Sequence, residues 1–160
     1  MRALVTGAAG FIGSNVVRTL LSRGADVRAL HLPGEDLRAL DGVDAERFAG
    51  DITDRDAMTR AMRGRDVVFH LAAIYALWTH DRGRRMRHVN VEGTRIVLET
   101  AREAGVRRVV HTSSIARFGG QGMHRRATEE SPFALGWTGD PYSASKNEAH
   151  SDSSGATRGT

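Results

Sequence analysis

Two residues near the C-terminal end of the chain could form an acid–base pair. Tyr142 and Lys146 are four positions apart, so on a helix they would share one face and lie one turn from each other. A tyrosine is a poor base near neutral pH, and a nearby ammonium group stabilises its phenolate. Such pairs also arise by chance on many helices, where a surface tyrosine lies over a lysine stem. The pair gains meaning only together with other motifs.

A glycine-rich segment near the N-terminus has the spacing of a phosphate-binding turn. Gly7, Gly10 and Gly13 stand between a predicted strand and a predicted helix. The first can make a tight turn, the second lets the backbone approach a pyrophosphate, and the third lets the helix pack against the strand. The first amides of the helix would then point at the phosphates, whose charge the helix dipole favours. We therefore predict a dinucleotide site here that includes Thr6, Phe11 and Ile12.

A hydroxyl-bearing segment, Thr112-Ser113-Ser114, comes directly after another predicted strand. Ligands of open α/β sheets bind at the carboxyl ends of the strands. A hydroxyl at this place can hold a substrate carbonyl or alcohol. The alternative interpretation is a helix cap or a turn, which is the ordinary role of an isolated serine pair.

The end of the second predicted strand leaves the choice between NAD and NADP open. A dinucleotide fold often places an acid there to bind the adenosine ribose. Here the position holds His31, and no acid follows until Glu35 and Asp36, beyond a Pro-Gly break. No arginine at the strand end is placed for a 2′-phosphate. His31 has no second ligand beside it, so we expect no metal site.

Three further segments are candidate cofactor contacts. Asp51-Ile52 follows the third predicted strand and could meet the adenine, although the acid could equally serve a helix dipole. Leu71-Ala72-Ala73 follows the fourth strand, where small residues allow a cofactor to approach the backbone. Asn90 lies inside a predicted helix, and because asparagine is a mediocre helix former it indicates a polar role.

Strand and helix patterns alternate along the chain. Strands are predicted at 2–6, 26–31, 45–49, 66–71 and 107–112, and helices at 11–23, 35–40, 54–62, 82–104 and from Pro141 or Tyr142 to His150. Strict alternation predicts a parallel sheet covered on both faces, a doubly wound Rossmann-type α/β fold. Residues 1–150 would form this domain. Residues 151–160 contain no large apolar side chain, so we expect a disordered tail.

The composition is that of a globular domain. The chain has 160 residues, of which 40% are hydrophobic and 26% charged. No apolar run approaches the length of a membrane span, and the N-terminus enters a strand without a signal peptide. The lack of cysteine excludes disulfides and thiolate metal sites. These features favour the cytoplasm.

Arginine carries nearly all of the positive charge, since Lys146 is the only lysine and the net charge is +4. Arginines cluster over 82–87 and at 125–126. A basic patch could bind nucleic acid, which would give a steep salt dependence. Because no nucleic-acid-binding module accompanies the charge, we interpret it as a solvated surface and expect no nucleic-acid partner.

Taken together, the motifs resemble the extended or atypical short-chain dehydrogenase/reductase superfamily, the NAD-dependent epimerase/dehydratase family. They are Thr6-Gly-Ala-Ala-Gly-Phe-Ile-Gly13, Asp51-Ile52, His70-Leu-Ala-Ala73, Asn90-Val-Glu-Gly-Thr94, Thr112-Ser-Ser114 and Tyr142-x-x-x-Lys146, in the family's order. The stretch Ala73-Ile-Tyr-Ala-Leu-Trp78 looks most similar to the dihydroflavonol-reductase-like branch, which includes hopanoid-associated sugar epimerases.

The resemblance implies roles for the candidate residues. Tyr142 would be the general base or acid, Lys146 would promote its ionisation and bind the nicotinamide ribose, and Ser114 would bind the reacting oxygen. Ser114 is chosen over Ser113 because the family's hydroxyl lies four residues before an aromatic-glycine pair, here Phe118-Gly119, with phenylalanine in place of the usual tyrosine. Hydride would pass between a nicotinamide cofactor, NAD or NADP, and a substrate such as a sugar nucleotide, ketone or alcohol.

Family members continue beyond the Tyr-x-x-x-Lys helix into further strands and a smaller substrate-binding domain. This chain ends at Thr160, and its last ten residues do not resemble the family, so we expect a truncated, cofactor-binding half. The fifth strand, with Val109 and Val110, would then form an exposed hydrophobic edge that favours a homodimer or aggregation. The alternative function is a non-catalytic dinucleotide-binding module or an inactive fragment.

Overall fold

The computed structural model describes residues 1–76, 78–118 and 126–156, with side chains described through Ser151. The chain divides into two compact units. The first consists of Met1–Ala72 and Ile96–Thr112, and the second of Ala73–Arg95 and Ser113–Thr160.

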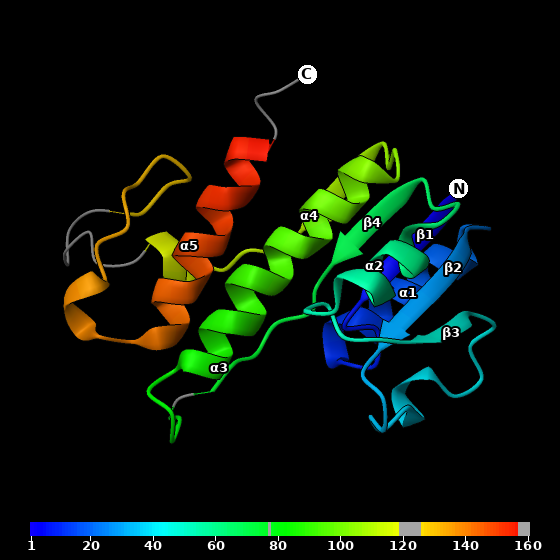
Figure 1. Ribbon diagram of the computed structural model, residues 1–160, viewed down its shortest axis with the longest axis horizontal. Helices are drawn as coiled ribbons and strands as arrows, with labels where there is room; N and C mark the ends of the chain where they lie inside the picture. The colour runs from blue at the N-terminus through cyan, green and yellow to red at the C-terminus, as the bar shows by residue number, and fades with distance from the viewer. Residues whose placement is uncertain (77, 119–125, 157–160) are drawn as a thin grey trace. The chain divides into compact units, whose positions relative to one another are not determined.

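The first unit is built on a five-stranded parallel sheet (Figure 1). The strands lie in the order β3-β2-β1-β4-β5. Their bounds are β1 Arg2–Thr6, β2 Asp26–His31, β3 Glu46–Ala49, β4 Val67–His70 and β5 Arg108–His111. The order reverses at β1, between β2 and β4, which is the switch point where doubly wound sheets bind ligands. The predicted Rossmann-type fold is thereby confirmed.

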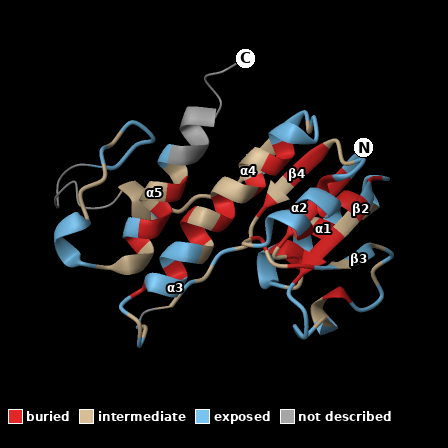
Figure 2. Cartoon of the chain, in the orientation of Figure 1, coloured by how far each residue is buried: buried red, intermediate tan, exposed pale blue. Residues whose placement is uncertain are grey.

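The core of the first unit is made by the central strand and the helix that follows it. Residues Ala3, Leu4 and Val5 of β1 are fully buried (Figure 2). Ala3 and Val5 pack in one cluster with Val17 and Leu20 of α1 (Phe11–Ser22), and by strand alternation Leu4 points to the opposite face. Apolar residues therefore stand on both sides of the strand, which is the pattern of a sheet that helices cover on both faces.

Helix α2 (Arg55–Met62) begins at Asp54, whose side chain accepts a hydrogen bond from the amide of Ala57. Ala57, Met58, Ala61 and Met62 turn the apolar face of the helix inward. The helix is tied to the C-terminal part of α4 (Thr94–Glu103) by ion pairs from Arg55 to Glu99 and Glu103.

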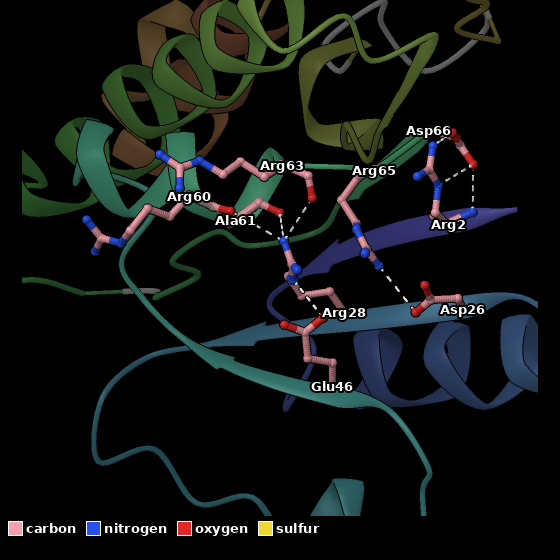
Figure 3. Close-up of polar contacts among 9 residues, drawn as sticks. All are labelled: Arg2, Asp26, Arg28, Glu46, Arg60, Ala61, Arg63, Arg65 and Asp66. Carbon is pink, nitrogen blue, oxygen red and sulfur yellow. Dashed lines mark hydrogen bonds and ion pairs between the residues drawn. The ribbon is translucent and has the colours of Figure 1, made fainter.

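Arg28, in the middle of β2, joins this strand to β3 and to the C-terminal end of α2 (Figure 3). Its Nη1 donates to the carbonyl of Ala61 at 2.7 Å, near the C-terminus of α2, and its Nε donates to Glu46 of β3 at 2.9 Å. The guanidinium thus satisfies carbonyls that a helix terminus leaves without partners. Nearby, Arg2 and Asp66 pair through a 2.8 Å contact, and this pairing holds the pKa of the Asp66 carboxyl well below its usual range.

Strand β5 is an edge of the sheet as described. The side chain of Val110 is 42% exposed, in agreement with the expected apolar edge. The pairing of two copies along this edge stays a prediction.

The second unit is helical. It contains α3 (Arg84–Arg87), a π-helical segment (His88–Gly93), 3₁₀ turns at Ile115–Phe118 and Gly136–Thr138, and α5 (Pro141–Ala156). The N-terminus of α3 packs closely on that of α5, since a Cβ on Gly83 would lie 2.3 Å from the Cβ of Pro141. No helix in the described part of the chain has the length and apolarity that crossing a membrane requires.

Three predicted helices differ from the structure by more than one residue. The helix predicted over 35–40 is only a 3₁₀ turn at Arg38–Leu40. The helix predicted over 82–104 begins at Arg84 and is interrupted by the π-helical segment around Asn90. Helix α5 continues past His150 to Ala156, and Ser151 donates a hydrogen bond to the carbonyl of Asn147 within it. Helical hydrogen bonding therefore extends into a stretch without large apolar side chains, and the rest of the predicted tail lies outside the described residues.

Candidate functional site

The glycine turn in the first unit is closed by backbone packing. A Cβ on Gly13 would lie 2.0 Å from the carbonyl oxygen of Gly7, and one on Gly7 would lie 2.9 Å from the Cα of Ala72. Gly7 also has φ +65°, in the left-handed region that favours glycine. Two of the three predicted glycines are therefore required by contact with other backbone. Gly10 is less constrained, with 3.4 Å to the same carbonyl.

Helix α1 starts in this turn with its amides uncapped. Gly10 is the N-cap residue and has no side chain that could accept from them, and the first turn holds no acid. The side chains of Phe11 and Ile12 are 85% and 58% exposed, so the start of the helix faces open space. A helix N-terminus in this state has donors that can bind an anion. The pyrophosphate of a dinucleotide fits this donor set, and Gly10 to Gly13 are the residues that would hold it.

Thr6 connects the ends of β1 and β4 beside the turn. Its Oγ1 accepts hydrogen bonds from the amides of Leu71 and Ala72, each at 3.2 Å. The hydroxyl proton is then directed to Nδ1 of His70, 2.8 Å away. Nδ1 of this buried histidine is therefore the acceptor, which places the ring proton of the neutral form on Nε2. Thr6 thus shapes the turn at Leu71 and Ala72 from inside the protein.

An acidic side chain reaches the end of β2, where the sequence places His31. His31 is buried, with Nδ1 3.0 Å from the carbonyl oxygen of Leu32. The carboxylate of Glu35 folds back across the Pro-Gly break and accepts from the amide of Leu32 at 2.8 Å. Asp36, in turn, pairs with Arg38. The sequence could not reveal this return of Glu35, because it depends on the local turn at Pro33-Gly34.

The other candidates of the first unit have mainly local contacts. Asp51 accepts from the amide and hydroxyl of Thr53, at 2.9 and 2.8 Å, and the side chain of Ile52 is buried. Thr112 is exposed, and its amide donates to the carbonyl of His70. A cofactor role for these three residues stays a prediction.

Asn90 is the most heavily bonded candidate in the second unit. Its Oδ1 accepts from the amide of Ile74 at 2.7 Å, and its Nδ2 donates to the Ile74 carbonyl and to Ser145 Oγ, each at 3.0 Å. Ser145 Oγ also donates to the carbonyl of Tyr142. Asn90 therefore ties the segment after β4, where Ala73 is exposed, to the helix that carries Tyr142 and Lys146. Its polar role is a positioning role, and π-helical segments such as this one are frequent at functional sites.

Tyr142 and Lys146 lie one turn apart on α5, as the spacing predicts. The Lys146 side chain is almost wholly enclosed, with 5% exposure, and this burial lowers the pKa of its ammonium group. The Tyr142 ring meets the ring of Tyr75 edge-on, with 4.8 Å between centroids. Asp140 caps the helix by accepting from the amides of Tyr142 and Ser143.

The two serines of the hydroxyl segment differ in their bonding. Ser114 Oγ accepts from the amide of Ala116 at 3.2 Å, which is the capping role considered as the alternative. Ser113 Oγ is buried and has no hydrogen-bond partner among the described residues. Gly119 of the aromatic-glycine pair and Leu77 of the 73–78 stretch lie outside those residues.

A family model described as the NAD dependent epimerase/dehydratase family matches residues 3–157. The chain belongs to this family. Its ancestry is therefore enzymatic, as the motifs predict.

Relatives within the family cover several activities. The chain is 45% identical over 138 residues to sterol demethylase protein B of Methylococcus capsulatus. This alignment covers 85% of the chain and 42% of the relative. It is 42% identical over 125 residues to a putative dihydroflavonol 4-reductase of Synechocystis. That alignment covers 78% of the chain and 36% of the relative. The chain thus spans less than half the length of these two curated relatives.

A solved structure of the family gives the same picture. The UDP-glucose 4-epimerase of Thermus thermophilus, in complex with NAD, is 32% identical and has a TM-score of 0.87. The match covers 99% of this chain and 51% of that one. The fold described above is therefore that of an epimerase/dehydratase-family protein over about half of its length.

Proposed function

We propose that this chain binds NAD or NADP through the glycine turn and is the cofactor-binding half of an NAD(P)-dependent oxidoreductase or epimerase. The observation that carries the proposal is the turn itself. Its backbone leaves no room for a Cβ at Gly13, and the helix that it opens has uncapped amides and no acid in its first turn. An anionic group at this place would meet several N–H donors and the positive end of the helix dipole.

The proposed chemistry uses side chains of the second unit. When bound, the nicotinamide ring supplies or accepts a hydride. Tyr142 holds or takes the proton of the substrate oxygen at its Oη, and Ser114 binds that oxygen through Oγ. Lys146 contributes a positive charge that stabilises the tyrosinate, and its enclosure strengthens this effect because a buried charge is poorly screened.

The substrate is proposed as a carbonyl or hydroxyl compound, either a sugar nucleotide or a ketone and its alcohol. In an epimerase the hydride leaves a carbon and returns to its other face, whereas in a reductase it leaves with the product. The relatives include a protein named UDP-glucose 4-epimerase and one named as a putative dihydroflavonol 4-reductase, so both types of reaction are retained for this chain.

Isotope transfer tests the proposal. The chain is incubated with 4-²H-labelled NADH or NADPH and a panel of ketones and, separately, with NAD⁺ or NADP⁺ and UDP-glucose labelled with deuterium at C4. Deuterium is sought by mass spectrometry in the alcohols formed from the ketones and in the reduced cofactor formed from UDP-glucose. We expect label in at least one of them and a loss of at least about 100-fold in Tyr142→Phe, which lacks the acid–base group. Cofactor binding without transfer to any substrate would favour the alternative, a non-catalytic dinucleotide-binding module.

The choice of serine is tested with the same assay. Ser114→Ala is expected to lower transfer more than Ser113→Ala, because Ser114 is the residue assigned to the reacting oxygen. A larger loss in Ser113→Ala would assign that oxygen to the buried hydroxyl of Ser113.

A further inference from the structure

A second aromatic ring stands beside the residue assigned to acid–base chemistry. The rings of Tyr75 and Tyr142 have centroids 4.8 Å apart, and their planes cross at 82°. Aromatic pairs prefer this edge-to-face arrangement, because the positive edge of one ring meets the negative face of the other. Both residues belong to the second unit, so the contact lies within one compact part of the chain. The contact limits how far either ring can swing.

The main chain in front of Tyr75 is held at two points. The amide of Ile74 donates to Oδ1 of Asn90 at 2.7 Å, and the Ile74 carbonyl accepts from Nδ2 of the same side chain at 3.0 Å. Asn90 is buried, so water does not compete for these bonds. Two bonds to one residue fix the orientation of its backbone as well as its position. Tyr75 is 65% exposed, yet its ring projects from a fixed root.

The same asparagine is bonded to the helix that carries Tyr142. Its Nδ2 donates to Ser145 Oγ at 3.0 Å, and Ser145 Oγ donates to the carbonyl of Tyr142 at 2.8 Å. The two tyrosines are therefore both connected to the side chain of Asn90. Contact between their rings closes these connections into a circuit, so that each ring is restrained by the anchoring of the other.

The backbone contacts of Tyr142 leave the orientation of its ring open. Asp140 accepts from the Tyr142 amide, and Ser145 donates to the Tyr142 carbonyl, but neither bond acts on the side-chain torsions χ1 and χ2. Acid–base chemistry needs Oη within hydrogen-bond reach of the substrate oxygen. A small displacement of a catalytic group slows a reaction strongly. A neighbour that restrains this ring therefore acts on the rate of the chemical step.

We propose that Tyr75 is a positioning residue, whose ring holds the Tyr142 ring in the orientation that presents Oη to the substrate oxygen. This inference rests on the proposed function for the role of Tyr142. It assigns the effect to the aromatic ring of Tyr75 and not to its hydroxyl group, since the contact is between rings. In the alternative, Tyr75 contacts the substrate directly and leaves Tyr142 unaffected in the free protein.

The chain has two tyrosines, which makes the test direct. Protein labelled with ¹³C in the tyrosine rings gives signals from Tyr75 and Tyr142 alone, and Tyr75→Phe identifies which is which. We expect a nuclear Overhauser effect between the two rings in the unaltered chain without ligands. Relaxation of the Tyr142 ring carbons should report larger motion in Tyr75→Ala, whereas Tyr75→Phe should preserve the order of that ring.

Trp78→Ala is the matched control for these spectra. Trp78 lies in the same segment and is 68% exposed, but its ring meets that of His80, at 4.2 Å between centroids. Its removal is expected to leave the order of the Tyr142 ring unchanged. Absence of the Overhauser effect, or a Tyr142 ring that is as ordered in Tyr75→Ala as in the unaltered chain, overturns the proposal.

Hydride transfer by the same variants separates positioning from substrate contact. At saturating ketone, Tyr75→Ala is expected to lower the transfer rate by about two- to tenfold, the range that an aromatic pair supplies, while KM changes less. Tyr75→Phe should recover most of this loss. A raised KM with an unchanged saturated rate would assign Tyr75 to substrate binding and overturn its positioning role. Absence of transfer by the unaltered chain would refute the proposed function, whereas the ring order of Tyr142 tests the restraint by Tyr75 in either case.

Discussion

Substitution of Gly13 by alanine separates backbone packing from helix propensity. Within a helix, alanine is favoured over glycine by about 1 kcal/mol, so propensity alone would make Gly13→Ala stabilising. The structure gives the opposite sign. The new Cβ would lie 2.0 Å from the carbonyl oxygen of Gly7 and 2.8 Å from its carbon, and these are backbone atoms that cannot rotate away. Overpacking of this kind typically costs about 1–3 kcal/mol even where side chains can yield.

We therefore expect Gly13→Ala to lower the free energy of unfolding by about 3 kcal/mol, at the upper end of that range. Gly10→Ala is the matched control, since its Cβ would meet the same oxygen at 3.4 Å and its φ is −73°. A loss below about 1 kcal/mol is expected there. Urea unfolding followed by circular dichroism measures both. Equal stability of the two variants would refute the close packing of α1 against the turn.

Three other variants test separate contacts. Arg28→Met removes the tie from β2 to the C-terminus of α2 and to β3, so the free energy of unfolding should fall by about 1–3 kcal/mol in the same urea assay. Asn90→Leu removes the three hydrogen bonds of its amide and leaves the Ile74 amide unpaired; we expect a lower melting temperature and slower hydride transfer, with NAD⁺ affinity changed less. Arg2 lowers the pKa of Asp66, so their pairing stabilises the folded protein at pH values above the ordinary carboxyl pKa of about 4. This stabilisation is lost as the pH falls through the lower pKa that Asp66 has in the folded state. Arg2→Met should return the Asp66 titration, followed by carboxyl ¹³C shifts, toward that ordinary value, and an unchanged titration would show that the pair is not formed in solution.

The sequence was sufficient for the fold because its strongest signals are local. Glycines between a strand and a helix, apolar strands and regular alternation each constrain the chain over short distances, and together they admit a doubly wound parallel sheet. The expectation that β5 is an edge strand came from its being the last strand predicted in the chain. Tyr142 and Lys146 could be placed on one helical face from their spacing alone.

The remaining features depend on contacts between distant residues. Thr6 appears in the sequence only as the residue before the turn, whereas its role arises from amides at the end of β4. The π-helical segment and the true partners of Asn90 arise from packing against Ile74 and Ser145, which no helical pattern encodes.

The central claim is that the glycine turn binds a dinucleotide. Its most direct test is calorimetric titration of the purified chain with NAD⁺ and with NADP⁺. The Gly10→Ala variant is titrated in parallel, as is the Gly13→Ala variant under conditions in which it is folded. We expect saturable binding of at least one dinucleotide by the unaltered chain. The tighter of the two will identify the cofactor that the His31 and Glu35 region accepts. Absence of binding by either, in a chain that circular dichroism shows to be folded, would contradict the assignment of the glycine turn as a dinucleotide site.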